Sequence, residues 1–325
     1  MRFTMRFFLL TAIALSFAGE AAVAQALKYE MKTIGKHNDE VLGIFVNEDD
    51  SKVATCSLDE SIKIWSLPDG KELLKMTGHF GQVNNLSFSG NDKYLASGSG
   101  DMTVRVWDTK TGDEMAVLQG HTDQVIGVYF SQDDSSTLIA STSFDQTVKL
   151  WDWRLNTEVK TLRGHTMPTN NVAYSYSGKF LASCSDDKTI KIWSTDLTTL
   201  EPLKTLKGHM APVLTVLFSF DDKYMASSDQ NGEIIIWTVA DWKPVKFLRG
   251  HTKLVQDVSF AGDNRTLVSA SLDKTVRLWD VETGNELLNF DTGIEVWSVD
   301  LVSDASIIIF GCADGTVRFL TKKKK

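Results

Sequence analysis

Residues 269–280 read SASLDKTVRLWD, and close copies stand at 183–194 (SCSDDKTIKIWS) and at 141–152 (STSFDQTVKLWD). In each copy a short run of small residues leads to a turn that contains Asp. A run rich in β-branched residues then follows and ends at Trp. Repetition of the same dozen residues predicts a chain built from copies of one structural unit.

A Gly-His pair marks the start of most copies, at 78–79, 120–121, 164–165, 208–209 and 250–251. Lys36-His37 holds this place in an earlier copy, and Asp291-Thr292 holds it in a seventh. The copies start 41 to 44 residues apart, which is typical of a four-stranded propeller blade. No segment after residue 24 has helical spacing. We therefore expect an all-β fold, a seven-bladed β-propeller of four-stranded antiparallel blades.

The combination of Gly-His, a turn Asp and a closing Trp-Asp or Trp-Ser resembles the WD-repeat β-propeller family, over residues 25–321. The resemblance implies that His, Ser, Asp and Trp of each repeat form one buried hydrogen-bonded network that holds the blade together. The residues assigned to this network are His37, Ser57, Asp59, Trp65; His79, Ser99, Asp101, Trp107; His121, Ser143, Asp145, Trp151; His165, Ser185, Asp187, Trp193; His209, Trp237; and His251, Ser271, Asp273, Trp279.

Two copies depart from this pattern. The fifth has Asp229 and Asn231 at the Ser and Asp places, and the seventh keeps only Asp314. We expect both blades to be held together less rigidly than the others.

Ser, His and Asp together also have the composition of a catalytic triad. That interpretation would need five equivalent triads, each with its own Trp, so we interpret the set as structural. All six His of the chain occupy the repeat position, and none is left for a general base or a metal site. We expect a non-enzymatic protein without cofactor or metal. The alternative is an enzyme-like or ion-binding propeller that uses carboxylates in its channel.

Residues 1–24 have the layout of a secretory signal peptide. Arg2 and Arg6 precede an apolar run at 7–19, and Ala22-Val23-Ala24 has the small-x-small pattern of a cleavage site. We expect cleavage after Ala24, a secreted or periplasmic protein, and no stable membrane insertion afterwards. An uncleaved anchor is the alternative.

The charge of the chain limits the classes of partner. Its net charge is −8, so no basic field would attract nucleic acid. The one dense basic run is 322–325, which we interpret as a solvated tail. Cys56, Cys184 and Cys312 fall in the same strand of three different repeats, and we interpret them as packing thiols.

The seventh copy ends at TVRFLT, 316–321, so its outermost strand does not follow it in the chain. The segment LKYEMKTIGKH, 27–37, has the form of the outermost strand of the other copies. In the family the N-terminal strand completes the last blade, and closure of this kind removes an open sheet edge.

In WD-repeat propellers, three places in each blade line the narrower face. From these places we chose apolar and acidic residues as candidates for partner binding: Leu42, Leu58, Phe144, Leu214, Leu254, Leu272, Glu40, Glu295 and Trp297. Clusters of apolar residues on a surface mark interaction sites, and Trp is a common anchor. The resemblance therefore implies a scaffold whose partner is a protein or peptide, with a basic residue to match the two glutamates. The other interpretation is that some of these side chains only pack in the channel.

Overall fold

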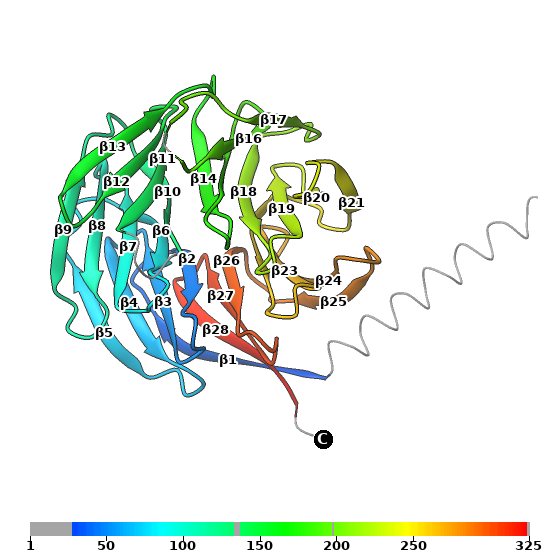
Figure 1. Cartoon of the computed structure of the whole chain (residues 1–325). Coiled ribbons are helices and arrows are strands. Elements are labelled where there is room, and N and C mark those ends of the chain that lie inside the picture. Colours follow the sequence, from blue (N-terminus) through cyan, green and yellow to red (C-terminus); the bar gives the residue numbers. More distant parts are fainter. Residues whose placement is uncertain (1–27, 133–136, 197, 324–325) are drawn as a thin grey trace, which may run out of the picture.

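A computed structural model describes residues 28–132, 137–196 and 198–323. Within these ranges, 28 strands form seven four-stranded antiparallel sheets arranged in a ring (Figure 1). No helix in the described ranges is long and apolar enough to cross a membrane. The predicted all-β, seven-bladed fold is confirmed. The predicted signal peptide, 1–24, lies outside the described residues.

Each blade takes four strands in chain order, from the channel outward, and the last blade takes β1 as its fourth. Blades 1 and 2 contain β2 (Val41–Val46), β3 (Lys52–Ser57), β4 (Ser61–Ser66), β5 (Glu72–Thr77), β6 (Val83–Phe88), β7 (Tyr94–Ser99), β8 (Thr103–Asp108) and β9 (Glu114–Gln119). Blades 3 and 4 contain β10 (Val125–Phe130), β11 (Leu138–Ser143), β12 (Val148–Asp152), β13 (Thr157–Leu162), β14 (Thr169–Tyr174), β15 (Phe180–Ser185), β16 (Thr189–Ser194) and β17 (Lys204–Lys207). Blades 5 and 6 contain β18 (Val213–Phe218), β19 (Tyr224–Asp229), β20 (Ile234–Thr238), β21 (Pro244–Leu248), β22 (Val255–Phe260), β23 (Thr266–Ser271), β24 (Thr275–Asp280) and β25 (Glu286–Asp291). Blade 7 contains β26 (Val296–Leu301), β27 (Ile307–Cys312), β28 (Thr316–Lys322) and β1 (Tyr29–Lys36).

The core lies between neighbouring blades. Because each sheet is covered on both faces, its second and third strands are buried along most of their length rather than on alternate residues. One cluster joins Val41 and Trp65 of blade 1 to Ile309 and Phe319 of blade 7. Cys56, Cys184 and Cys312 are free and buried within such clusters, as packing thiols.

Every innermost strand carries a β-bulge where it pairs with the second strand of its blade. A bulge leaves one extra residue outside the ladder and turns its side chain in a new direction. The extra residues are Leu42, Asn84, Ile126, Asn170, Leu214, Gln256 and Trp297. Three of the candidates for partner binding, Leu42, Leu214 and Trp297, therefore occupy this special position.

The ring is closed by the two ends of the chain. Strand β1 pairs antiparallel with β28, from Tyr29 opposite Lys322 to Lys36 opposite Thr316 (Figure 1). The amide of His37 then donates to the carbonyl of Gly315 at 2.9 Å. The predicted closure by the N-terminal segment is confirmed.

Candidate functional site

The repeated polar residues form a one-way chain of hydrogen bonds inside the blade. In blade 2, Trp107 Nε1 donates to Ser97 Oγ at 2.8 Å. That hydroxyl lies 2.7 Å from His79 Nε2. His79 Nδ1 in turn lies 2.8 Å from Asp101, a carboxylate that can only accept. Because the carboxylate only accepts, Nδ1 of the neutral imidazole carries the proton, and Nε2 accepts from the serine hydroxyl. Both imidazole nitrogens are therefore hydrogen-bonded.

This tetrad of Trp, hydroxyl residue, His and Asp recurs around the ring. The hydroxyl is Thr55 in blade 1, Ser141 in blade 3, Ser183 in blade 4, Ser227 in blade 5 and Ser269 in blade 6. All six His are buried. The hydrogen bonds of each tetrad therefore stabilise its own blade.

The predicted serine of the network is wrong by two residues. The hydroxyl of Ser99 is hydrogen-bonded elsewhere: it donates to the carbonyl of Gly81 and accepts from the amide of Asp101, both at 3.1 Å. Ser57, Ser143, Ser185 and Ser271 make the equivalent turn contacts. Residues two apart on a strand face the same side, so the repeat pattern does not distinguish them. The hydroxyl in mid-strand lies under the indole, and the one at the strand end caps the turn.

The tetrads shift the ionisation of their members. Burial alone would raise the pKa of Asp101, but hydrogen bonds from His79 and Thr103 outweigh it and hold the pKa below its ordinary value. In blade 1 the imidazole is farther from its carboxylate, with His37 Nδ1 3.3 Å from Asp59. There burial dominates and lowers the pKa of His37 to about 4.

Blade 5 corrects a second expectation, because its tetrad is complete. Asp229, at the end of β19, lies 2.9 Å from His209 Nδ1 and replaces the missing turn Asp. Ser227 joins His209 to Trp237. In the other tetrads the Asp stands two residues later in the repeat, at the place where blade 5 has Asn231. The sequence therefore suggested that blade 5 lacks the carboxylate.

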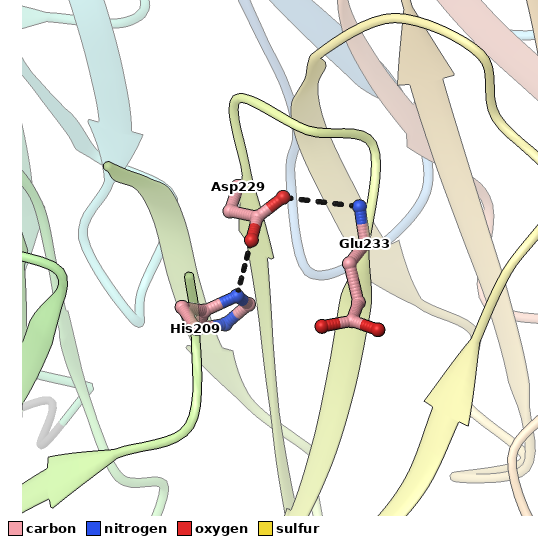
Figure 2. A group of neighbouring side chains, drawn as sticks. All are labelled: His209, Asp229 and Glu233. Carbon is pink, nitrogen blue, oxygen red and sulfur yellow. Dashed lines mark hydrogen bonds and ion pairs between the residues drawn. The ribbon is translucent and has the colours of Figure 1, made fainter. Parts of the chain in front are cut away.

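His209, Asp229 and Glu233 also offer one ligand atom each within 4.8 Å of one another (Figure 2). A metal would need a lone pair of the imidazole, and both nitrogens of His209 are already hydrogen-bonded. The carboxylate of Glu233 accepts from Arg249 Nε at 2.7 Å. The chemistry of this group is therefore that of a tetrad and not of a metal centre.

Blade 7 lacks the tetrad. Phe310 and Leu320 stand where the other blades have the hydroxyl and the Trp, and both are buried. Thr292 replaces His and donates to the carbonyl of Lys274 at 2.8 Å. Apolar packing takes the place of the polar chain in this blade.

The candidates for partner binding lie at one end of the channel, on what we call the His–Asp face. This face carries the segments that follow each tetrad His and the turns that contain or directly follow each tetrad Asp. Leu42, Leu58, Leu214, Leu254, Leu272 and Trp297 are all half-buried there. Trp297 Nε1 is buried without a hydrogen-bond partner in the described structure. Phe144 is more open, with 38% of its surface exposed.

The two candidate glutamates lie close to each other on the His–Asp face. Burial raises the pKa of Glu40, and the charges of Asp39 and Glu295 raise it further. Glu295 forms an exposed ion pair with Lys253, with 3.0 Å between Nζ and Oε1. Exposed pairs of this kind add little stability.

Sequence reasoning missed the most exposed apolar residues of the His–Asp face. Phe80 is 85% exposed and Met210 is 76% exposed, and each directly follows a tetrad His. Met102 and Met167 of blades 2 and 4 are also exposed. The signal was present in the sequence, because Thr122, Thr166 and Thr252 occupy this place in other copies.

A cavity of about 150 Å³ opens at the opposite end of the channel. It is lined by the last residues of the innermost strands and by the loops that join first and second strands, such as those at Asn47–Asp50 and Ser89–Asp92. Asp257, Asp300, Tyr129 and Tyr176 are among the lining residues. None of the candidate residues predicted from the sequence lines this cavity.

A family model described as WD domain, G-beta repeat matches residues 28–66, 70–108, 112–152, 156–194, 200–238 and 242–280. These segments cover most of the chain. The protein belongs to the WD40-repeat family. No matched segment contains β26, β27 or β28 of blade 7, the WD40 blade that lacks the tetrad and is stabilised by apolar packing.

The WD40 assignment agrees with a solved structure. The WD40 beta propeller domain of Doa1 is 26% identical, with a TM-score of 0.78, over 91% of this chain and 97% of that one. No curated protein matches the chain. WD40 propellers are typically scaffolds for protein interactions and are generally without enzymatic activity. The fold alone does not name a partner.

Proposed function

We propose that this WD40 propeller is an exported, non-enzymatic scaffold that binds a protein or peptide on its His–Asp face. The observation that carries the proposal is that the repeated polar residues are engaged in structural hydrogen bonds within the blades. The tetrads engage every His of the chain, both nitrogens of each imidazole included. The bulge residues and their neighbours at the channel mouth do not belong to the tetrads. These side chains differ from blade to blade, so they can provide a specific binding surface for a partner.

The partner is one that offers an apolar anchor beside a basic residue. Leu254, Leu272 and Trp297 provide partly exposed apolar surface in adjacent blades 6 and 7. Glu40 and Glu295 provide negative charge next to it. A Lys or Arg of the partner would replace Lys253 at Glu295 and lower the repulsion between the two glutamates.

Photo-crosslinking tests this face directly. A photoreactive phenylalanine analogue is placed at Leu254 on the His–Asp face, and in a matched control at Phe247 on the outer strand β21. We expect a crosslinked partner from the native compartment at Leu254 and none at Phe247. Trp297→Ala and Glu295→Gln should each reduce that crosslink at least fivefold. Equal crosslinking at both positions, or full retention in both variants, would exclude this face.

Export is tested at the N-terminus of the mature protein. Arg2, Arg6, the apolar run and Ala22-Val23-Ala24 support cleavage after Ala24. We expect the protein recovered from the periplasm or medium to begin at Gln25, as read by intact mass. Recovery of the whole chain inside the cell would contradict export.

A second candidate, an ion-binding propeller, is favoured by Asp257 and Asp300. Both carboxylates line the cavity, and neither belongs to a tetrad. Equilibrium dialysis with calcium, magnesium and zinc tests it. Stoichiometric retention of a metal that is lost in Asp257→Asn would support this candidate.

A further inference from the structure

The cavity at the end of the channel opposite the His–Asp face is lined by acidic and aromatic residues that take no part in the proposed partner binding. A cavity of about 150 Å³ is large enough for a ligand of roughly benzene size. Five acidic residues are among the described residues that line it, and no Lys, Arg or His is. Enclosed sites of one sign concentrate ligands of the opposite sign. The charge of this cavity therefore selects a cation.

Two of these five acidic residues lie on adjacent innermost strands, β22 and β26. Asp257 on β22 accepts from Ser298 at 2.6 Å and from two backbone amides. Asp300 on β26 accepts from Ser259 at 2.7 Å and from two backbone amides. An ionised carboxylate can accept about four hydrogen bonds. Each of the two therefore has one acceptor position that is not occupied by a hydrogen bond from the described residues.

The carboxylates lack a positive partner within the described part of the cavity. Burial raises the pKa of Asp257 to about 7 and that of Asp300 to about 6, despite the hydrogen bonds that each accepts. A buried carboxylate is costly to ionise without a counter-charge. A cation that entered the cavity would supply that counter-charge. Its attraction to the two carboxylates would be stronger than in water, because little solvent screens the charges there.

Aromatic rings form the wall contributed by the other blades. The ring centroids of Phe45 and Tyr129 lie 5.9 Å apart in an edge-to-face arrangement. Tyr176 and Phe220 lie 4.7 Å apart. Asp300 is close enough to Tyr129 for its charge to add to the effect of burial in raising the pKa of the phenol. Such rings pack against an alkyl chain and attract a cation through their faces.

We propose that this cavity binds a small primary alkylammonium ion. Its N–H groups donate to the remaining acceptor positions of Asp257 and Asp300, and its alkyl chain packs against the aromatic wall. A primary ammonium fits better than a quaternary one because it offers three donors to the two carboxylates.

The purified chain is titrated at pH 8 with n-butylammonium and, separately, with its neutral isostere n-butanol. The readout is the ring resonance of Tyr129 in selectively labelled protein, assigned with Tyr129→Phe. We expect a saturable shift with n-butylammonium and at least tenfold weaker binding of n-butanol. Equal affinity for the two ligands, or no saturable shift with n-butylammonium, would overturn the proposal.

Three variants locate the cation. Asp257→Asn and Asp300→Asn should each weaken n-butylammonium binding at least tenfold, and Asp113→Asn, an exposed control in blade 2, should not change it. Undiminished binding in both cavity variants would overturn the assignment. If the cavity variants do not fold, the comparison of the two ligands on the unaltered chain still decides.

Two further ligands refine the chemistry. Tetramethylammonium, which has no N–H donor, should bind at least fivefold more weakly than n-butylammonium; equal or tighter binding would contradict the primary-ammonium assignment. Nα-acetyl-lysine amide separates the sources of the ammonium group. Tighter binding than n-butylammonium would indicate a lysine side chain of a peptide, and weaker binding a free amine. Both results support the ammonium site.

Discussion

Ser298 of β26 donates a hydrogen bond of 2.6 Å to Asp257 of β22, across the boundary between blades 7 and 6. The reverse contact lies beside it, where Ser259 of β22 donates to Asp300 of β26 at 2.7 Å. The two blades are therefore joined next to the channel by a reciprocal pair of serine–aspartate contacts. At the place of Asp257 the other blades have Gly43, Asn85, Gly127, Asn171, Thr215 and Ser298, all uncharged.

This pair predicts a loss of stability as the pH rises. The folded pKa of Asp257, about 7, and that of Asp300, about 6, lie above the unfolded value near 4, so the folded state holds more protons over this range. Their favourable contribution is full below pH 4 and disappears as the pH passes through 6 to 7. One pKa unit corresponds to about 1.4 kcal/mol, so the free energy of unfolding should fall by a few kcal/mol.

Urea unfolding at pH 5 and pH 8 measures this fall. The double variant Asp257→Asn/Asp300→Asn should lose less stability than the unaltered chain between the two values. An identical pH dependence in the two proteins would show that the carboxylates do not titrate in this way.

The tetrad predicts that removal of the Ser97 hydroxyl lowers the free energy of unfolding. Ser97→Ala leaves Trp107 Nε1 and His79 Nε2 without their partner in a buried place. We expect a loss of roughly 1–3 kcal/mol in the free energy of unfolding, measured by chemical denaturation. The control is Ser306→Ala, an exposed serine whose removal should change stability by less than about 0.5 kcal/mol. Equal effects would argue against a bridging role for Ser97.

Closure by β1 predicts that the ring depends on residues at the start of the described chain. A chain that begins at Ile34 lacks most of β1 and exposes the edge of β28. Its midpoint of thermal unfolding should fall by on the order of 10 °C relative to a chain that begins at Gln25. Calorimetry on the two chains makes the comparison, and equal midpoints would contradict closure.

A point variant tests the same strand without truncation. A Cβ on Gly35 would lie 2.1 Å from the ring of Trp65, so Gly35→Ala must displace a buried indole. We expect a loss of roughly 1–3 kcal/mol. Lys32→Ala, on the exposed part of β1, should be close to neutral in the same urea titration.

Blade 7 should open most readily, because it has no tetrad. Amides of β27 and β28 should exchange hydrogen faster than those of β19 and β20 in blade 5, whose tetrad is complete. Hydrogen exchange followed by mass spectrometry resolves the blades. Equal protection would mean that the pairing of β1 with β28 and the apolar pair Phe310–Leu320 stabilise blade 7 as well as a tetrad does.

Much of the fold could be predicted from the sequence because repetition fixes it. Copies such as SASLDKTVRLWD, spaced 41 to 44 residues apart, indicated seven blades, and LKYEMKTIGKH indicated the strand that closes them. A repeat of this kind cannot bury its faces alone, so its period determines how copies stack. The same repetition showed that every His has a structural place.

Only the tertiary structure decided which atoms meet. It put Ser97 rather than Ser99 under Trp107, and it gave His209 a partner in Asp229. It also brought Asp257 and Asp300, 43 residues apart on adjacent blades, into one cavity. The physical reason is that the sequence fixes the order of residues within a blade, while contacts between side chains depend on bulges, strand ends and the angle at which neighbouring blades pack.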